Sequence, residues 1–230
     1  MNVVLAFDCA ITGLGAALLR DGALLAVHRE EGRDQAARLM PVVARLFETA
    51  GLDRRAVTLL AVTVGPGSFT GVRVGLAAAR GLAIALDVPL AGIATTDVLL
   101  AQAGTDDAVG DRLAVAAIDT HLGDWFCALG APQDPSPFVA STEALAEKLQ
   151  GRSCRVVGLE AVRLAAALEA LGIDATAQAT LLDPVVLARL ATERDAEDWR
   201  RRNRAEGLPR PLYLRGVNIT LPDGQRRTVD

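Results

Sequence analysis

Aromatic residues, histidines and cysteines are all scarce in this 230-residue sequence. Aromatic residues make up 3% of the chain although 51% of it is hydrophobic, so its core must be built largely from Ala, Val and Leu. The two histidines, His28 and His121, form no HExxH pattern, which excludes a zinc peptidase of that type. The three cysteines have no CxxC spacing, and therefore indicate buried thiols in a reducing compartment rather than disulfides or a zinc site.

An excess of positive charge is lacking as well. The net charge is −4, which argues against a chain that binds nucleic acid by itself. The N-terminal residues MNVVLAFDCA contain no basic region, and their apolar run ends at Asp8, so we predict a first strand rather than a signal peptide. We also expect no apolar run long enough to span a membrane. These features together predict a soluble, cytoplasmic protein.

The most distinctive stretch runs from Thr63 to Leu86 and predicts a strand, a glycine-rich elbow and a buried helix. Gly71, Gly75 and Ala79 place small residues on one helix face, which permits close packing. Ser68 or Thr70 can cap the helix, whose free N–H groups would then form an anion site. The elbow residues singled out as a candidate site are Gly65, Gly67, Ser68, Thr70, Gly71 and Arg73.

Two interpretations of this elbow remain open: a structural turn that serves packing, and a phosphate-binding turn. Neither common nucleotide motif is present. A P-loop requires Lys-Ser/Thr after its last glycine, whereas Val72 and Arg73 follow Gly71. The G-x-G-x-x-G spacing fails too, because three residues separate Gly67 from Gly71.

The chain divides into two similar halves. The turn Asp21-Gly22 joins two strand-like runs, 14–20 and 23–30, and a helix is predicted for 35–50. After a polar segment at 104–111, a strand ending at Asp119 repeats the strand that ends at Asp8. Two βββαβα-type halves predict a duplicated α/β fold of the actin, Hsp70 and sugar-kinase (ASKHA) type. The expected divisions and late elements are a first half at 1–104, a second half at 105–215, a flexible tail at 216–230 and one long helix from Pro184 to about Arg204.

Asp8 and Asp119 end matching strands, where an active member of this fold would hold a metal–phosphate complex. Together with Thr12 they form a candidate nucleotide or phosphate site, which we expect to be degenerate. Ala10 stands where a working phosphate loop has glycine, and its Cβ impedes close approach of a phosphate. No Gly-Gly adenosine loop follows in the second half. The sequence offers no catalytic residues and no metal ligands that we can name.

The run GPGSFTGVRVGLAAARGLA resembles the signature of the bacterial TsaB (YeaZ) family, which acts in tRNA threonylcarbamoyladenosine biosynthesis. The segments AAID and PLYLR, at 116–119 and 211–215, resemble further family motifs. Gln35, His121 and Asp124 depart from the family pattern, in which His, Arg and Glu are usual. Residues 131–182 contain no motif that we can align.

This resemblance implies the ASKHA fold and a non-catalytic scaffold subunit. Its partners would be TsaD, a paralogue that carries the active site, and the ATPase TsaE, with tRNA bound only through the complex. It implies no required cofactor, with any ATP or ADP binding weak and belonging to the complex. Alternatives are a small ATP-dependent kinase or acyl-phosphate enzyme of the same fold, and a glycoprotease. Ala10 argues against the kinase, and the shortage of histidines argues against the protease.

A pair of helices, 35–50 and 71–86, is predicted to bind TsaD, or a second copy of the chain when TsaD is absent. Both are richer in apolar or small residues than a surface pair needs. A paralogue of the same fold would present a similar pair, so a pseudo-symmetric contact is available. The predicted contact residues are Leu39, Val43, Leu46, Val74, Ala78 and Gly81.

Overall fold

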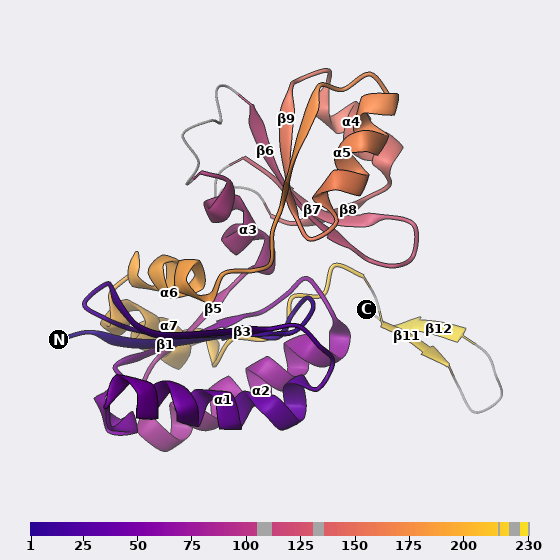
Figure 1. Ribbon diagram of the computed structural model, residues 1–230. Coiled ribbons are helices and arrows are strands. Elements are labelled where there is room, and N and C mark those ends of the chain that lie inside the picture. Colours follow the sequence, from indigo (N-terminus) through magenta and orange to yellow (C-terminus); the bar gives the residue numbers. More distant parts are fainter. Residues whose placement is uncertain (105–111, 131–135, 216, 221–225, 230) are drawn as a thin grey trace.

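Two lobes, each built on a five-stranded mixed sheet, make up the computed structural model (Figure 1), which describes residues 1–104, 112–130, 136–215, 217–220 and 226–229. The first sheet consists of β1 (Val3–Asp8), β2 (Leu14–Arg20), β3 (Ala23–Glu30), β4 (Leu59–Thr63) and β5 (Leu90–Ile93). The second consists of β6 (Leu113–Asp119), β7 (Trp125–Leu129), β8 (Phe138–Ala140), β9 (Cys154–Gly158) and β10 (Ala175–Ala179).

The two lobes have the same topology. The first sheet has the order β3-β2-β1-β4-β5, and the second has the equivalent order β8-β7-β6-β9-β10. In both, three antiparallel strands are followed by two parallel ones. The helices recur at equivalent places: α1 (Gln35–Ala50), α2 (Phe69–Leu86) and α3 (Thr95–Ala103) in the first half, and α4 (Thr142–Leu149), α5 (Ala161–Ala170) and α6 (Pro184–Thr192) in the second. The predicted duplicated α/β fold is confirmed.

Helices cover both faces of the first sheet, which explains the continuous apolar runs of its central strands. Successive side chains of a strand point to opposite faces. Val3, Leu5 and Phe7 of β1 pack with the apolar residues of α1 and α2, whereas Val4 and Ala6 pack with those of α6. In Figure 1, α1 and α2 lie on one side of this sheet and α6 on the other. The sheet therefore forms the middle layer of three.

The third helix of each half packs on the sheet of the other half. α3 follows β5 of the first sheet but packs on β6, β7 and β9 of the second, and α6 follows β10 but packs on β1 and β2. Gln102 near the end of α3 joins the two connections, since its side-chain amide donates to the Thr180 hydroxyl at 3.0 Å and accepts from the Asp183 N–H at 3.0 Å. This exchange ties the lobes together through their cores.

The structure corrects several predictions for the second half. The long helix expected from Pro184 is two helices, because the chain leaves the helical path after Thr192 and α7 (Ala196–Glu206) begins after Asp195. β8 and β10 were not predicted. α3 begins without a side-chain cap, since Ala94 occupies its N-cap position.

The proposed divisions of the chain stay predictions. α6 and α7, from the second half of the sequence, pack on strands of the first sheet. Within the tail at 216–230, β11 (Val217–Thr220) pairs antiparallel with β12 (Arg226–Val229), and the rest lies outside the described residues. Whether this tail is flexible is not tested by the pairing.

α2 lies close to the first sheet because a row of glycine and alanine residues runs along its inner face, beside the buried Val72 and Leu76. Gly71, Gly75, Ala79 and Ala83 are buried along that face, as the spacing predicts. A Cβ added to Gly71 would lie 1.9 Å from the carbonyl oxygen of Cys9. Only glycine therefore permits the observed approach of α2 to the end of β1.

α2 also meets the length and hydropathy expected of a membrane-crossing helix, contrary to our expectation for the sequence. One such helix is weak evidence for a membrane protein, because core helices have the same composition. Here the small residues Gly75 and Ala79 face the sheet, and the larger Ile84 on the outer side is 74% exposed.

Residues 208–215, which we call the strap, follow α7 and return along the edge of the first sheet. The Leu212 N–H donates to the Val64 carbonyl at 2.7 Å, and Arg80 of α2 donates to the Pro209 carbonyl at 2.6 Å. Asn203 of α7 bonds both backbone groups of Leu90 in β5, at 2.8 and 3.0 Å. These contacts satisfy backbone groups that an edge strand would otherwise leave open.

Two glycines of α2 provide a matched test of this packing. Gly71→Ala forces a methyl group against a backbone carbonyl and should lower the free energy of unfolding by about 1–3 kcal/mol. Gly81→Ala meets no atom within 4 Å and should raise it by up to about 1 kcal/mol through helix propensity. Urea unfolding followed by circular dichroism measures both. Equal effects of the two substitutions would contradict the packing argument.

Candidate functional site

Asp8 ends β1 at the position where the fold would hold a phosphate complex, but its carboxylate faces the protein interior. It is 4% exposed. Oδ1 accepts hydrogen bonds from the Thr63 hydroxyl at 2.5 Å and from the Ala10 N–H at 2.9 Å. Burial raises the pKa of Asp8 above its ordinary value of 3.8, although these hydrogen bonds favour the charged form. Through these hydrogen bonds Asp8 links the loop after β1 to β4.

The glycine elbow packs against the same loop. The Ser68 N–H donates to the Ala10 carbonyl at 2.6 Å, and the Ser68 hydroxyl accepts from the Gly71 N–H at 3.3 Å. Ser68 is thus the N-cap of α2, one of the two residues that we had considered. A Cβ on Gly67, whose φ is +157°, would lie 2.1 Å from the Ala10 oxygen. Two donors that an anion could have used are engaged inside the chain, which favours the packing interpretation of the elbow.

A cavity of about 20 Å³ lies between the lobes at this point. Asp8 and Thr12 line it from the first lobe, and Leu159 and Thr180 line it from the second. Asp119 is not among its described lining residues, so the structure brings together only two of the three residues of the predicted phosphate site. This volume holds about one water molecule. A nucleotide does not fit in this cavity beside Asp8.

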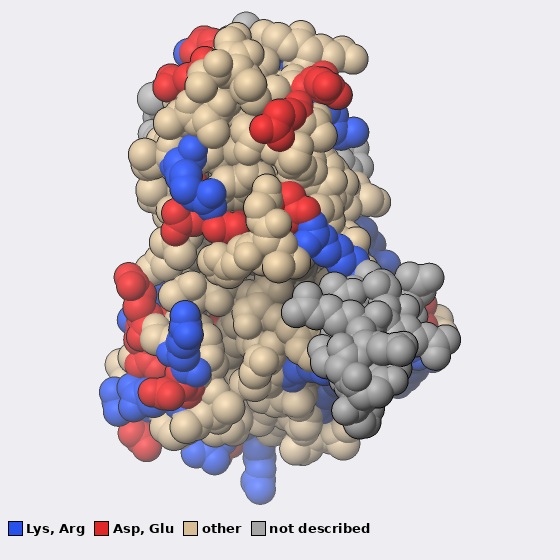
Figure 2. Space-filling model, turned by 90° about the vertical axis from the view of Figure 1, so that its right-hand side faces the viewer, with Lys and Arg blue, Asp and Glu red and all other residues tan. Residues whose placement is uncertain are grey.

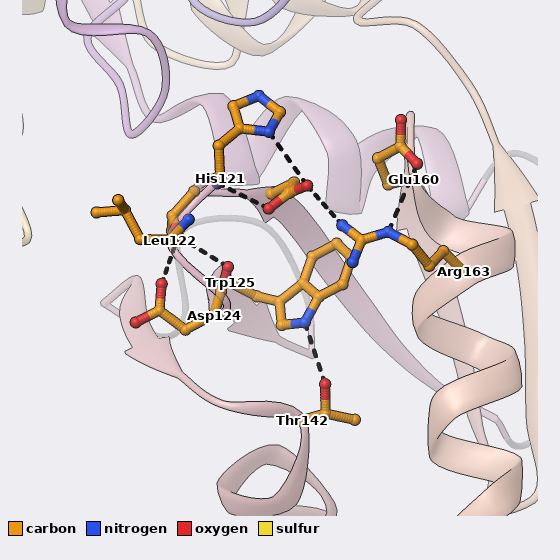
Figure 3. Close-up of polar contacts among 9 residues, drawn as sticks. His121, Leu122, Asp124, Trp125, Thr142, Glu160 and Arg163 are labelled. Carbon is orange, nitrogen blue, oxygen red and sulfur yellow. Dashed lines mark hydrogen bonds and ion pairs between the residues drawn. The ribbon is translucent and has the colours of Figure 1, made fainter.

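Asp119 belongs instead to a polar cluster at the β6–β7 turn (Figure 3). Its carboxylate accepts from the His121 N–H at 2.8 Å and from the Arg163 guanidinium at 2.5 Å, and His121 Nδ1 lies 3.3 Å from Oδ2. Arg163 of α5 also lies 4.3 Å from the ring centroid of Trp125, and the Trp125 N–H donates to Thr142 at 3.2 Å. The cluster joins the turn to α5 and α4.

Asp119 and His121 form the carboxylate–imidazole pair of a general base, but no nucleophile accompanies them in the described part of the chain. Asp119 orients His121, whose side chain is 86% exposed. No hydroxyl or thiol in the described part of the chain is bonded to that imidazole. The three cysteines are buried, as predicted, and burial raises the pKa of Cys127 to about 12 and that of Cys154 to about 11. Over the described residues, no group of three His, Cys, Asp or Glu side chains could hold a metal ion.

The exposed end of the elbow presents an aromatic and arginine cluster that the sequence did not predict. Arg73 donates to the Tyr213 hydroxyl at 2.8 Å, and its guanidinium carbon lies 3.5 Å from the ring centroid of Phe69. The rings of Phe69 and Tyr213 stack with their centroids 5.7 Å apart. Thr70 is exposed beside them. Gly65 lies deeper, and its carbonyl accepts a hydrogen bond from the Thr95 N–H. The PLYLR segment therefore lies directly against the elbow, 140 residues away in sequence.

The predicted partner face is partly wrong. Leu39, Val43 and Leu46 are buried in the core of the first lobe, because the apolar stripe of an amphipathic helix faces its own sheet. Val74 and Ala78 of α2 are partly buried, and Gly81 is exposed. The outer side of α1 carries other apolar residues instead: Ala37, Met40, Pro41 and Ala44, with Met40 47% exposed.

Comparison with known proteins places this geometry in context. Residues 27–119 match the family model described as TsaD, tRNA N6-adenosine threonylcarbamoyltransferase. The chain is 34% identical over 125 residues to the tRNA threonylcarbamoyladenosine biosynthesis protein TsaB of Escherichia coli, covering 54% of this chain and 53% of that protein. It is 33% identical over 100 residues to TsaB of Bacillus subtilis, covering 43% and 44%. The matches span about half the length of these curated relatives.

Solved structures extend the similarity over nearly the whole chain. YeaZ from Pseudomonas aeruginosa superposes with a TM-score of 0.70 at 26% identity, covering 93% of this chain and 100% of that one. A second Pseudomonas aeruginosa structure, of an uncharacterized protein similar to peptidase YeaZ, gives a TM-score of 0.73 at 27% identity, covering 94% and 100%. Both lobes are therefore shared with these proteins.

The burial of the Asp8 carboxylate can be tested by the pH dependence of stability. A carboxyl group whose pKa is higher in the folded protein stabilises it fully below the unfolded pKa, near 3.8, and this contribution is lost as the pH rises through the folded pKa. Asp8→Asn keeps an oxygen acceptor for Thr63 and Ala10 but does not titrate. The melting temperature of the variant minus that of the wild type should increase between about pH 4 and pH 7. A difference that is constant over this range would show that Asp8 is not held in a desolvated site.

Proposed function

Because the chain belongs to the TsaB/YeaZ family, we propose that it is a non-catalytic subunit in tRNA threonylcarbamoyladenosine biosynthesis. It would pair with a TsaD-like paralogue in the cytoplasm, and TsaD would carry the metal and the reaction. TsaE would act on this pair, and tRNA would reach the chain through the complex. No cofactor is required of this subunit, and any ATP or ADP would be bound by the complex.

The observation that carries the non-catalytic role is the closed state of the superfold's phosphate site. The Asp8 carboxylate points inward and accepts a hydrogen bond from Thr63, and the Ala10 carbonyl accepts one from the Ser68 N–H of the elbow. The cavity beside Asp8 holds about one water molecule. An ATP-dependent kinase would need the opposite arrangement, with an accessible carboxylate and room for a triphosphate. The kinase alternative therefore has no support from the geometry.

The docking face would be the outer surface of α1 and α2, which lie side by side on the outside of the first sheet (Figure 1). Apolar or small residues reach this surface from both helices, including Met40, Ala44, Gly81 and Ile84. The absence of a side chain at Gly81 permits close approach of another helix. A TsaD of the same fold would present equivalent helices, and a second copy of this chain could use the same face when TsaD is absent.

Gly81 allows the interface to be tested without disturbing the fold. Gly81→Glu places a carboxylate in open space in the free chain, so folding should be preserved. In the complex the charge would be desolvated without a partner, which should weaken association with TsaD by at least about 2 kcal/mol, or about 30-fold. Isothermal titration calorimetry with purified TsaD gives the affinity, and size exclusion with light scattering gives the homodimer fraction.

The matched control is Ala166→Glu, at an exposed position in the middle of α5, the helix equivalent to α2 in the second lobe. It should leave TsaD binding unchanged. If Gly81→Glu binds TsaD as tightly as this control does, the interface lies elsewhere. If the wild-type chain does not bind TsaD at all, the proposed function is wrong.

A further inference from the structure

A second and larger cavity is lined by residues of both lobes. Figure 2 shows the hollow between the lobes on one side of the molecule, where uncharged surface is bordered by acidic and basic side chains. Its volume is about 330 Å³, at the lower end of the range for ligand sites. Its walls come from the elbow and α2 (Pro66, Phe69 and Val72), from the β6–β7 region (Leu122 and Phe126) and from the strap (Tyr213). The cavity is distinct from the closed one beside Asp8.

Large apolar side chains at this cavity are unusually open to solvent. Phe69 and Tyr213 are each 43% exposed, and Leu122 is 70% exposed. The two rings are already stacked on each other and held by Arg73. Their orientation is thus fixed before any ligand arrives, so a planar group that stacks there would not have to order them.

The two elements that carry these rings, α2 and the strap, have charges of one sign only. α2 and the strap contain four arginines, Arg73, Arg80, Arg210 and Arg215, and no acidic residue, although the whole chain has a net charge of −4. Among the described residues, only Arg215 of these four is paired with a carboxylate, that of Asp124. Arg73 bonds the neutral Tyr213 hydroxyl instead. A ligand with a flat apolar part and a negative group would find both complements here.

We propose that this cavity binds an unpaired nucleotide of single-stranded RNA, with the base stacked on the Phe69–Tyr213 pair and its phosphate at Arg73. Aromatic rings beside basic side chains are the usual means by which proteins hold unstacked bases. A purely apolar side chain of a partner would leave the Arg73 guanidinium, which bonds only a hydroxyl group, without an anion. The proposal rests on the proposed function only in that this function brings an RNA to the chain.

The affinity of one such contact is modest, which agrees with the acidic net charge. Binding is therefore measured at low ionic strength by fluorescence anisotropy of a labelled single-stranded oligoadenylate, with the isolated chain at up to about millimolar concentration. Phe69→Ala and Tyr213→Ala should each weaken binding by about fivefold or more. Arg73→Ala should reduce the slope of log K against log salt by about 0.7, the value for one contact to a single strand.

Matched variants separate stacking from general effects. Tyr213→Phe keeps the ring and loses only the hydrogen bond to Arg73, so it should bind better than Tyr213→Ala. Leu171→Ala and Arg54→Ala change an exposed apolar residue and an exposed arginine away from the cavity, and should bind like the wild type. Circular dichroism and melting temperatures confirm that each variant is folded.

Three outcomes would overturn the proposal: no binding of the oligonucleotide by the wild type, equal binding by the Phe69→Ala and Leu171→Ala variants, or displacement of the RNA by an acidic, Phe-containing peptide that binds more tightly. The last outcome would assign the cavity to a protein partner. None of these measurements uses TsaD, so failure of the RNA site and failure of the proposed function can be told apart.

Discussion

The contact between the glycine face of α2 and the backbone of Cys9 and Ala10 is the constraint on which the first lobe depends. A Cβ atom on Gly67 or Gly71 would lie 2.1 or 1.9 Å from these carbonyl oxygens, far inside van der Waals contact. The approach fixes the height of α2 above the sheet. It also closes the loop that would otherwise receive a phosphate, because the Ala10 carbonyl accepts the Ser68 N–H at the elbow. One packing contact thus accounts for both the glycine-rich sequence and the closed site.

The same contact determines what α2 presents outward. Since its small residues face the sheet, its remaining surface is apolar and uncharged along Ala77, Gly81 and Ile84, and basic toward its N-terminus at Arg73. The strap then lies beside that basic end through the Arg73–Tyr213 and Arg80–Pro209 hydrogen bonds. We infer two separate surfaces on one helix: a helical docking face for a paralogue, and a stacking site at the N-terminus.

Local patterns in the sequence predicted much of the first lobe. The strands at 14–20 and 23–30 and the helix at 35–50 have the bounds that turn chemistry and periodicity indicated, and Asp21 and Gly22 have the positive φ values of a tight hairpin. β10 was missed because its sequence, ATAQA, has little β propensity, and β8 because it has three residues. The exchange of α3 and α6 between the lobes depends on tertiary packing, which no local pattern encodes.

The candidate site was predicted less well, for physical reasons. The sequence located Asp8, Asp119 and the elbow. It could not show that Asp8 accepts a hydrogen bond from Thr63, or that Asp119 accepts one from Arg163. The stripe of Leu39, Val43 and Leu46 indicated an apolar face without telling whether the protein's own sheet or a partner covers it. The stacking of Tyr213 on Phe69 joins residues too distant in sequence for any spacing rule.

The most direct test of the central claim, that the chain is a docking subunit with a closed phosphate site, is hydrogen–deuterium exchange with and without TsaD and ATP. The account predicts that TsaD slows amide exchange in peptides from the exposed sides of α1 and α2. It predicts that ATP alone leaves exchange unchanged in the loop at 8–12 and at the elbow. Protection of that loop by ATP, with no protection of α1 and α2 by TsaD, would contradict it.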